Sequence, residues 1–135
     1  MTTGILLQVG AMVTLTKVIS EADVALFTLV TNDRPPAADE PLTLDEGEPG
    51  PVPGALVAAL LACAAVQVAG GHPRTTIARA EIRCLASAQP DDALTVTAEV
   101  TAFDGGACSV SARAHCVDQS GRHLAHGSFE LRVGD

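Results

Sequence analysis

The stretch that decides the fold is GALVAALLACAAVQVA, residues 54–69. Apart from Gln67, every residue in it is apolar or glycine, so a helix formed here is apolar on all sides. A helix of that kind is buried rather than amphipathic. Its many alanines permit close packing against a sheet, and Gly70-Gly71 followed by Pro73 supplies a stop signal. The stretch is shorter than the roughly 20 residues that a membrane span needs.

The chain after this helix is typical of strands joined mainly by tight turns. Strict alternation over residues 94–101 predicts a strand with one apolar face. Asp104-Gly105-Gly106 is typical of a hairpin turn, and residues 119–121 form a second turn signal. Further strands are expected over 75–88, 107–118 and 122–133. The inner face of the 107–118 strand is expected to hold Cys108, Val110, Ala112, Ala114 and Cys116.

Ahead of the apolar helix lie a strand, a short helix and a long irregular segment. Residues 12–19 alternate in part and predict a first strand. Ser20-Glu21-Ala22-Asp23 matches a capping box, and Val24, Phe27 and Val30 at helical spacing extend the helix to about Thr31. Residues 32–53 then hold six of the eight prolines, which disfavour regular elements. A loop of this length is uncommon in a compact domain and is usually functional or disordered.

The length of the chain limits the number of domains, and its charge limits the kinds of partner it can bind. At 135 residues the chain fits one domain, 1–135, and 47% hydrophobic residues supply a sizeable core. A net charge of −8 and the absence of Trp and Tyr argue against nucleic acid. Arg74, Arg79 and Arg83 are interpreted as an outward strand face, with a patch for an anionic substrate as the alternative.

Four cysteines (Cys63, Cys84, Cys108 and Cys116) show no C-x-x-C spacing, and the first residues show no basic, cleavable leader pattern. We therefore expect a cytoplasmic protein with reduced, small core cysteines, no metal site and no cofactor. Membrane partners are not expected either.

Together these elements predict an α+β fold in which a curved antiparallel sheet wraps around one long buried helix. In a monomer the sheet would leave that helix incompletely covered. Pairing of two copies edge to edge would cover both the helix and the unpaired strand edge, so a homodimer is expected.

Several segments resemble the MaoC-like hot-dog proteins, the (R)-specific enoyl-CoA hydratases and dehydratases. The run ISEADVALF from Ile19 looks like the entry to that family's active-site region. The family's G-D-x-N-P-x-H segment is matched in part by NDRPPAA from Asn32, and the turn that opens its central helix by VPGAL from Val52. Strand segments such as DALTV from Asp92 extend the similarity over nearly the whole chain.

The resemblance implies site residues position by position. Its aspartate is Asp33, and the helix-entry glycine is Gly54, whose N–H would receive the thioester oxygen as charge develops. The family's histidine falls on Ala38, and the histidine beside the helix-entry glycine is Pro53. Ala38, Pro53, Leu56 and Phe27 are then expected to contact substrate. A turn-forming Asp33 and a plain helix-start Gly54 are the alternatives.

Because alanine cannot transfer a proton, the ordinary two-residue hydration mechanism is in doubt. The four histidines, His72, His115, His123 and His126, are interpreted as surface or strand residues, and Asp39 or Glu40 as solvated loop acids with a substitute acid or base as the alternative.

Three hypotheses follow from the resemblance. The favoured one is a repurposed, dehydratase-like protein acting on an acyl or polyketide-type thioester carried by CoA or an acyl carrier protein. The second is an inactive substrate-binding subunit paired with an active partner. The third is a genuine hydratase with a substitute acid or base.

Overall fold

The computed structural model describes residues 8–31, 51–70 and 74–134, which form five strands and two helices. Asp33 and Ala38 lie outside the described residues. In chain order the elements are β1 (Met12–Val18), α1 (Glu21–Thr31), α2 (Gly54–Val68), β2 (Thr76–Cys84), β3 (Ala93–Asp104), β4 (Ser109–Val117) and β5 (His123–Arg132).

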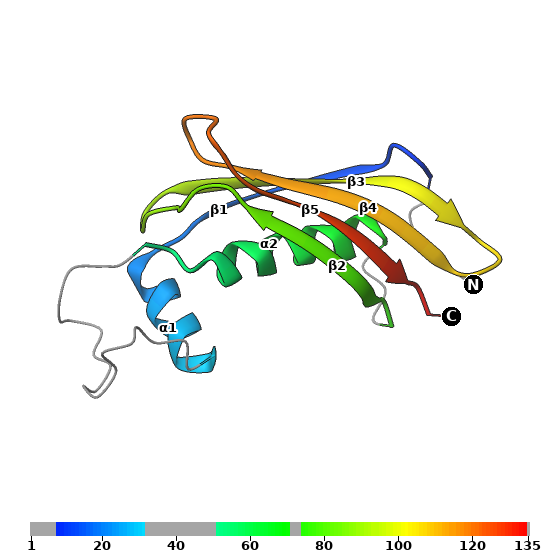
Figure 1. The fold of residues 1–135 in the computed structure, drawn as a ribbon, viewed down its shortest axis with the longest axis horizontal. Helices are drawn as coiled ribbons and strands as arrows, with labels where there is room; N and C mark the ends of the chain where they lie inside the picture. The colour runs from blue at the N-terminus through cyan, green and yellow to red at the C-terminus, as the bar shows by residue number, and fades with distance from the viewer. Residues whose placement is uncertain (1–7, 32–50, 71–73, 135) are drawn as a thin grey trace.

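The five strands form one antiparallel sheet in the order β1-β3-β4-β5-β2. The strands β1 and β2 lie at its two edges, and both helices lie on the same side of it (Figure 1). The predicted α+β architecture, a curved antiparallel sheet against one long helix, is therefore confirmed.

Alternation along the strands separates a buried inner face from an exposed outer face. Leu94, Val96, Ala98 and Val100 of β3 are buried, as the pattern predicts. On β4 the inner face begins at Val110, because Cys108 lies in the hairpin turn with a positive φ of 51° and is exposed. The expectation of four core cysteines is wrong for three: Cys63, Cys84 and Cys108 are exposed, and only Cys116 is buried.

The helix α2 packs on the inner face of the sheet through one side only. Its buried residues are Val57, Leu61, Ala64, Ala65 and Val68, which repeat at three- and four-residue intervals. Exposed Ala55, Ala59, Cys63 and Gln67 form the opposite side. The prediction of a helix buried all round is therefore correct for the sheet side alone, since no element among the described residues covers the other side.

The start of α1 is fixed by the capping box that the sequence predicts. The backbone N–H of Asp23 donates to Oγ of Ser20 at 3.1 Å, and the N–H of Ser20 donates to the Asp23 carboxylate at 3.0 Å. Val24 and Phe27 are partly buried, whereas Val30 is 78% exposed. Thr28 is buried as well, so the covered side of α1 extends from Val24 to Thr28.

The edge strand β2 is shorter than the predicted 75–88 strand. It ends at Cys84, because the next two amides, of Leu85 and Ala86, both donate to the carbonyl of Leu124 and so leave the strand register. The segment then turns back, and Val52 pairs with Ala88 in an isolated bridge. No helix among the described residues is long and apolar enough to cross a membrane.

Candidate functional site

A hollow of about 220 Å³ lies at the beginning of α2, where three parts of the chain meet. Its walls come from the residues that lead into α2, from the segment after β2, and from β5. It is lined by Val52, Gly54, Val57, Cys84, Leu85, Ala86, Ser87, Ala88 and Leu124. Most of these side chains are apolar, and the thiol of Cys84 and the hydroxyl of Ser87 are the polar ones. Hollows that combine apolar side chains with a few polar groups are the usual places for ligands, and this one is smaller than the typical range of about 300–1,000 Å³.

Two backbone amides at the start of α2 have no acceptor among the described residues. The N–H groups of Leu56 and Val57 donate to the carbonyl of Pro53, at 3.0 and 3.3 Å. The N–H groups of Gly54 and Ala55 have no such bond, and Pro53 supplies no side-chain cap. Free amides at the positive end of a helix dipole suit a developing negative charge on an oxygen.

The first residue of α2 lies against the thiol of Cys84. A Cβ atom added at Gly54 would be 3.4 Å from Sγ of Cys84, which is a tight but tolerable contact. Because Gly54 has no side chain, the space between the start of α2 and Cys84 stays open, and the Gly54 amide is not covered by a Cβ atom.

The wall opposite α2 is held in place by Asp118 and Arg122, which lie in the turn between β4 and β5. Arg122 donates from Nη2 to the carbonyl of Ser87 at 2.8 Å, and its Nε contacts the buried carboxylate of Asp118 at 3.3 Å. Together with the bonds from Leu85 and Ala86 to Leu124, this fixes residues 85–88 in position without any regular element.

The residues that the sequence singles out are brought only partly into this hollow. Gly54 lines it, and Pro53 and Leu56 lie beside it in sequence, with Leu56 partly buried against the core. Phe27 is partly buried on α1 and is not one of the lining residues. Asp33 and Ala38 lie outside the described residues, so their roles stay predictions.

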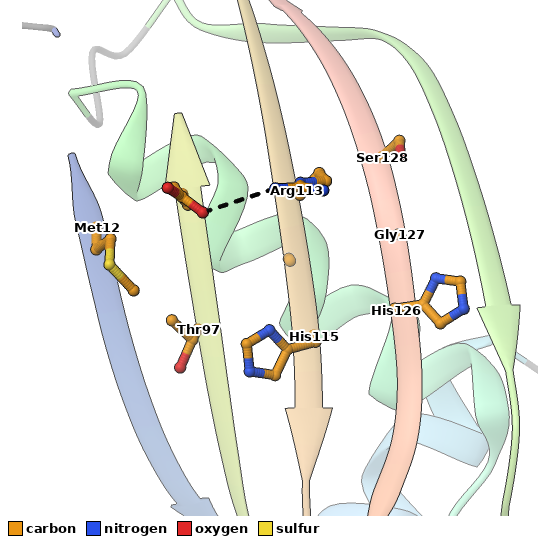
Figure 2. Close-up of a pocket in the computed structure, with 9 residues that line it drawn as sticks. Met12, Thr97, Arg113, His115, His126, Gly127 and Ser128 are labelled. Atoms are coloured by element: carbon orange, nitrogen blue, oxygen red, sulfur yellow. Dashed lines mark ion pairs between the residues drawn. The ribbon is translucent and has the colours of Figure 1, made fainter. Parts of the chain in front are cut away.

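A second hollow, of about 400 Å³, lies on the outer face of the sheet (Figure 2). His115 and His126 project there from neighbouring strands, beside Thr97, Ser128 and the Arg113–Glu99 ion pair. This face is on the far side of the sheet from α2. The expectation that His115, His123 and His126 are strand or surface residues is confirmed, since all three are exposed on or at the end of a strand.

Comparisons with solved structures agree with this architecture. The chain is similar to the (R)-hydratase from A. caviae involved in PHA biosynthesis, with a TM-score of 0.78 and 22% identity over 95% of this chain and 98% of that one. It is also similar to the R-hydratase PhaJ1 from Pseudomonas aeruginosa in the unliganded form, with a TM-score of 0.77 and 26% identity over 96% and 83% of the two chains. The chain has the MaoC-like hot-dog fold.

A third hot-dog neighbour is an assembly of two proteins, the ChsH1-ChsH2 complex from Mycobacterium tuberculosis. The TM-score is 0.73, with 19% identity over 96% of this chain and 100% of that one. No protein-family model and no curated protein sequence matches the chain.

Sequence reasoning missed the residues that complete the hot-dog hollow opposite Gly54. Cys84 reads as one of four small core cysteines, and Ser87 carries no motif. Cys84 is placed by its pairing with Ala125 at the end of β2, and Ser87 by the bonds that take residues 85–88 out of the strand. No pattern in the sequence predicts either.

Proposed function

We propose that this chain is a hydratase- or dehydratase-like protein that acts on an acyl thioester at the beginning of α2. The single observation that carries the proposal is that the amides of Gly54 and Ala55, at the edge of the hollow, have no acceptor among the described residues. Such amides stabilise negative charge that develops on a carbonyl oxygen. The similarity in fold to two (R)-hydratases supports the same reaction class.

In this proposal the thioester oxygen accepts a hydrogen bond from the N–H of Gly54. That bond strengthens as the oxygen gains enolate character, and the dipole of α2 adds to the effect. We propose that Pro53, Leu56, Ala38 and Phe27 contact the acyl chain beyond the residues that line the hollow. Val52, Val57 and Leu124 supply apolar side chains to the hollow, and the acyl chain packs against them in this proposal.

Proton transfer in this proposal rests on one carboxylate. Asp33 takes a proton from water as the water oxygen bonds to the β-carbon, and the same proton is then delivered to the α-carbon. Ala38 stands where the related hydratases have a histidine, and loss of one such partner costs about 10²–10⁴-fold. We therefore infer a repurposed or non-standard enzyme, whose substrate is an acyl or polyketide-type intermediate carried by CoA or an acyl carrier protein.

The test is incubation of the purified protein with a crotonyl-type enoyl thioester and with candidate acyl and polyketide intermediates. We expect turnover of at least one thioester and its loss in Asp33→Asn, which keeps the size of the side chain but removes the base. Asp39→Asn and Glu40→Gln serve as matched loop controls and are expected to keep the activity. An unchanged product profile with and without protein would overturn the proposal.

One comparison favours a second candidate, an inactive subunit that binds substrate for an active partner. The ChsH1-ChsH2 neighbour is a complex of two different proteins, so this fold occurs in a two-protein assembly. Co-expression with a tandem MaoC-like protein that has an intact Asp/His pair is the test. A stable mixed complex in which Asp33→Asn leaves the rate unchanged would support this candidate.

In the absence of such a partner we propose a homodimer, built on the uncovered side of α2 and the edge strand β2. The helices and this edge carry several exposed apolar residues, namely Leu26, Leu29, Val30, Ala59, Ile77 and Leu85, and the opposite edge strand β1 carries Met12 and Val18. Ala59→Arg places a charge in the centre of the uncovered side of α2, and we expect it to yield a monomer in light scattering. Thr14→Arg, on the exposed opposite edge strand, is the matched control and should leave the dimer intact.

A further inference from the structure

All three histidines among the described residues lie together on the outer face of the sheet, away from the beginning of α2. His115 is on β4, and His123 and His126 are on β5. His115 and His126 are direct cross-strand partners. Directly opposite residues of antiparallel strands have Cβ atoms about 4.5–5.5 Å apart, so their side chains can reach a common point.

A β-bulge brings the third histidine to the same face. Residues three apart on a regular strand point to opposite faces. Here the register shifts after Cys116, which pairs with Ala125, while Val117 pairs with His123, so Leu124 is an extra residue. Leu124 and Ala125 are consecutive, and each is 1% exposed. His123 and His126 on either side of them are therefore both turned outward.

The ring positions suit coordination of one ion by two of these side chains. The ring centroids of His115 and His123 are 6.0 Å apart and tilted by 47°. Because a metal–nitrogen bond is about 2.0–2.1 Å, two imidazoles on one ion have centres about 5–6 Å apart. In Figure 2 the His115 ring leans toward β3 and the His126 ring away from it, toward β2. The described residues accordingly hold no ready-made group of three metal-ligating side chains.

We propose that His115, His123 and His126 form a surface site for one divalent transition-metal ion of the class that imidazole favours, such as Zn²⁺ or Ni²⁺. His115 and His123 bind first, and His126 joins by a rotamer change. All three side chains are exposed, and exposed rotamers exchange within nanoseconds, so this turn is unhindered. Water completes the coordination, because three histidine ligands leave a tetrahedral position open.

Charged neighbours set the strength of the site. Arg83 is the cross-strand partner of His126 on β2, and its positive charge opposes a bound cation. Arg113 on β4 is paired with Glu99, at 4.0 Å, so its charge is partly offset. Replacing Arg83 by Gln should therefore tighten binding by a few-fold. Its removal leaves the three imidazoles in place and thus tests whether the ion lies at His126.

The experiment is calorimetric titration of the untagged protein with Ni²⁺ and with Zn²⁺, after alkylation of the exposed thiols to remove competing ligands. We expect one ion per chain, weakened about tenfold or more in His115→Ala and in His123→Ala, which each remove one of the two first ligands, and less in His126→Ala. His72→Ala is the matched control and should bind as the native chain does.

Three results would overturn the proposal. They are failure of the alkylated native protein to bind either ion, equal binding by His115→Ala, and equal weakening by His72→Ala. Far-ultraviolet circular dichroism of each variant confirms folding. The bound ion should also raise the melting temperature of the native chain and not that of His115→Ala, which gives a readout independent of any catalytic activity.

Discussion

Replacing Gly54 by proline is the most direct way to remove the proposed oxyanion donor while keeping the helix. Proline has no N–H, and it is favoured at the first position of a helix, where the amide has no helical partner. The residue before a proline must be extended, and Pro53 already has φ −57° and ψ 137°. Gly54→Ala is the matched control, because it keeps the amide and adds the same Cβ atom, 3.4 Å from Sγ of Cys84.

Loss of one oxyanion donor typically lowers kcat by about 10²–10³-fold, or about 2.7–4 kcal/mol. The amide of Ala55 remains in the proline variant, so we expect the lower end of that range. The alanine variant should stay within about threefold of the native rate, since a 3.4 Å contact needs only a small shift of the thiol. Both variants should be as stable as the native chain or more so, by about 0.4–1 kcal/mol, because glycine loses more entropy on folding.

The assay follows disappearance of the enoyl thioester, or formation of product from whichever thioester the chain turns over, with both variants at equal concentration. Thermal unfolding of each variant establishes that the fold is intact. Equal activity of Gly54→Pro and Gly54→Ala would show that this amide does not touch the reacting oxygen. Equal loss in both would assign the effect to crowding against Cys84 rather than to the missing N–H.

Three further predictions concern the fold. Burial raises the pKa of the Cys116 thiol to about 11, so alkylation of the native protein at pH 8 should modify exposed Cys108 and spare Cys116 until the chain is unfolded, as peptide mass mapping would show. Gly127→Ala should lower the free energy of unfolding by about 1–3 kcal/mol in urea titrations, because its Cβ would lie 3.0 Å from a backbone carbonyl and 3.1 Å from Phe129. Hydrogen bonds from the backbone and side chain of Ser20 hold the pKa of Asp23 below its ordinary value of 3.8. This stabilisation is present above pH 3.8 and is lost as pH falls through the lowered folded value, so Asp23→Asn should flatten stability over that acidic range.

Local patterns predict most of the fold because each depends on interactions between residues close in sequence. Alternation in β3 predicts one buried face, and the capping box at Ser20 predicts that two backbone amides find side-chain acceptors. The apolar run predicts the length of α2 and where the helix ends. It does not predict which side of the helix stays exposed, because that depends on how many strands pack against α2.

The site is less predictable because it is assembled from distant segments. Gly54 could be named from a motif at the start of the helix. Cys84 reaches the same hollow through its pairing with Ala125, and Ser87 because two amides after β2 share the carbonyl of Leu124. In the same way the bulge at Leu124, and not the spacing of the histidines, puts His123 and His126 on one face.

The two halves of the proposed site depend on different physics, and this constrains the reaction. The oxyanion half is made of backbone amides, whose direction is fixed by the start of α2 and survives changes of side chain. The proton-transfer half depends on side-chain identity, and there we propose that Ala38 stands in place of the histidine of the MaoC-like hydratases. A site that keeps the first half and loses part of the second still polarises a thioester carbonyl. Reactions limited by charge on that oxygen, such as thioester hydrolysis or an enolate-driven cyclisation, should therefore be retained better than hydration, which needs two coordinated proton transfers.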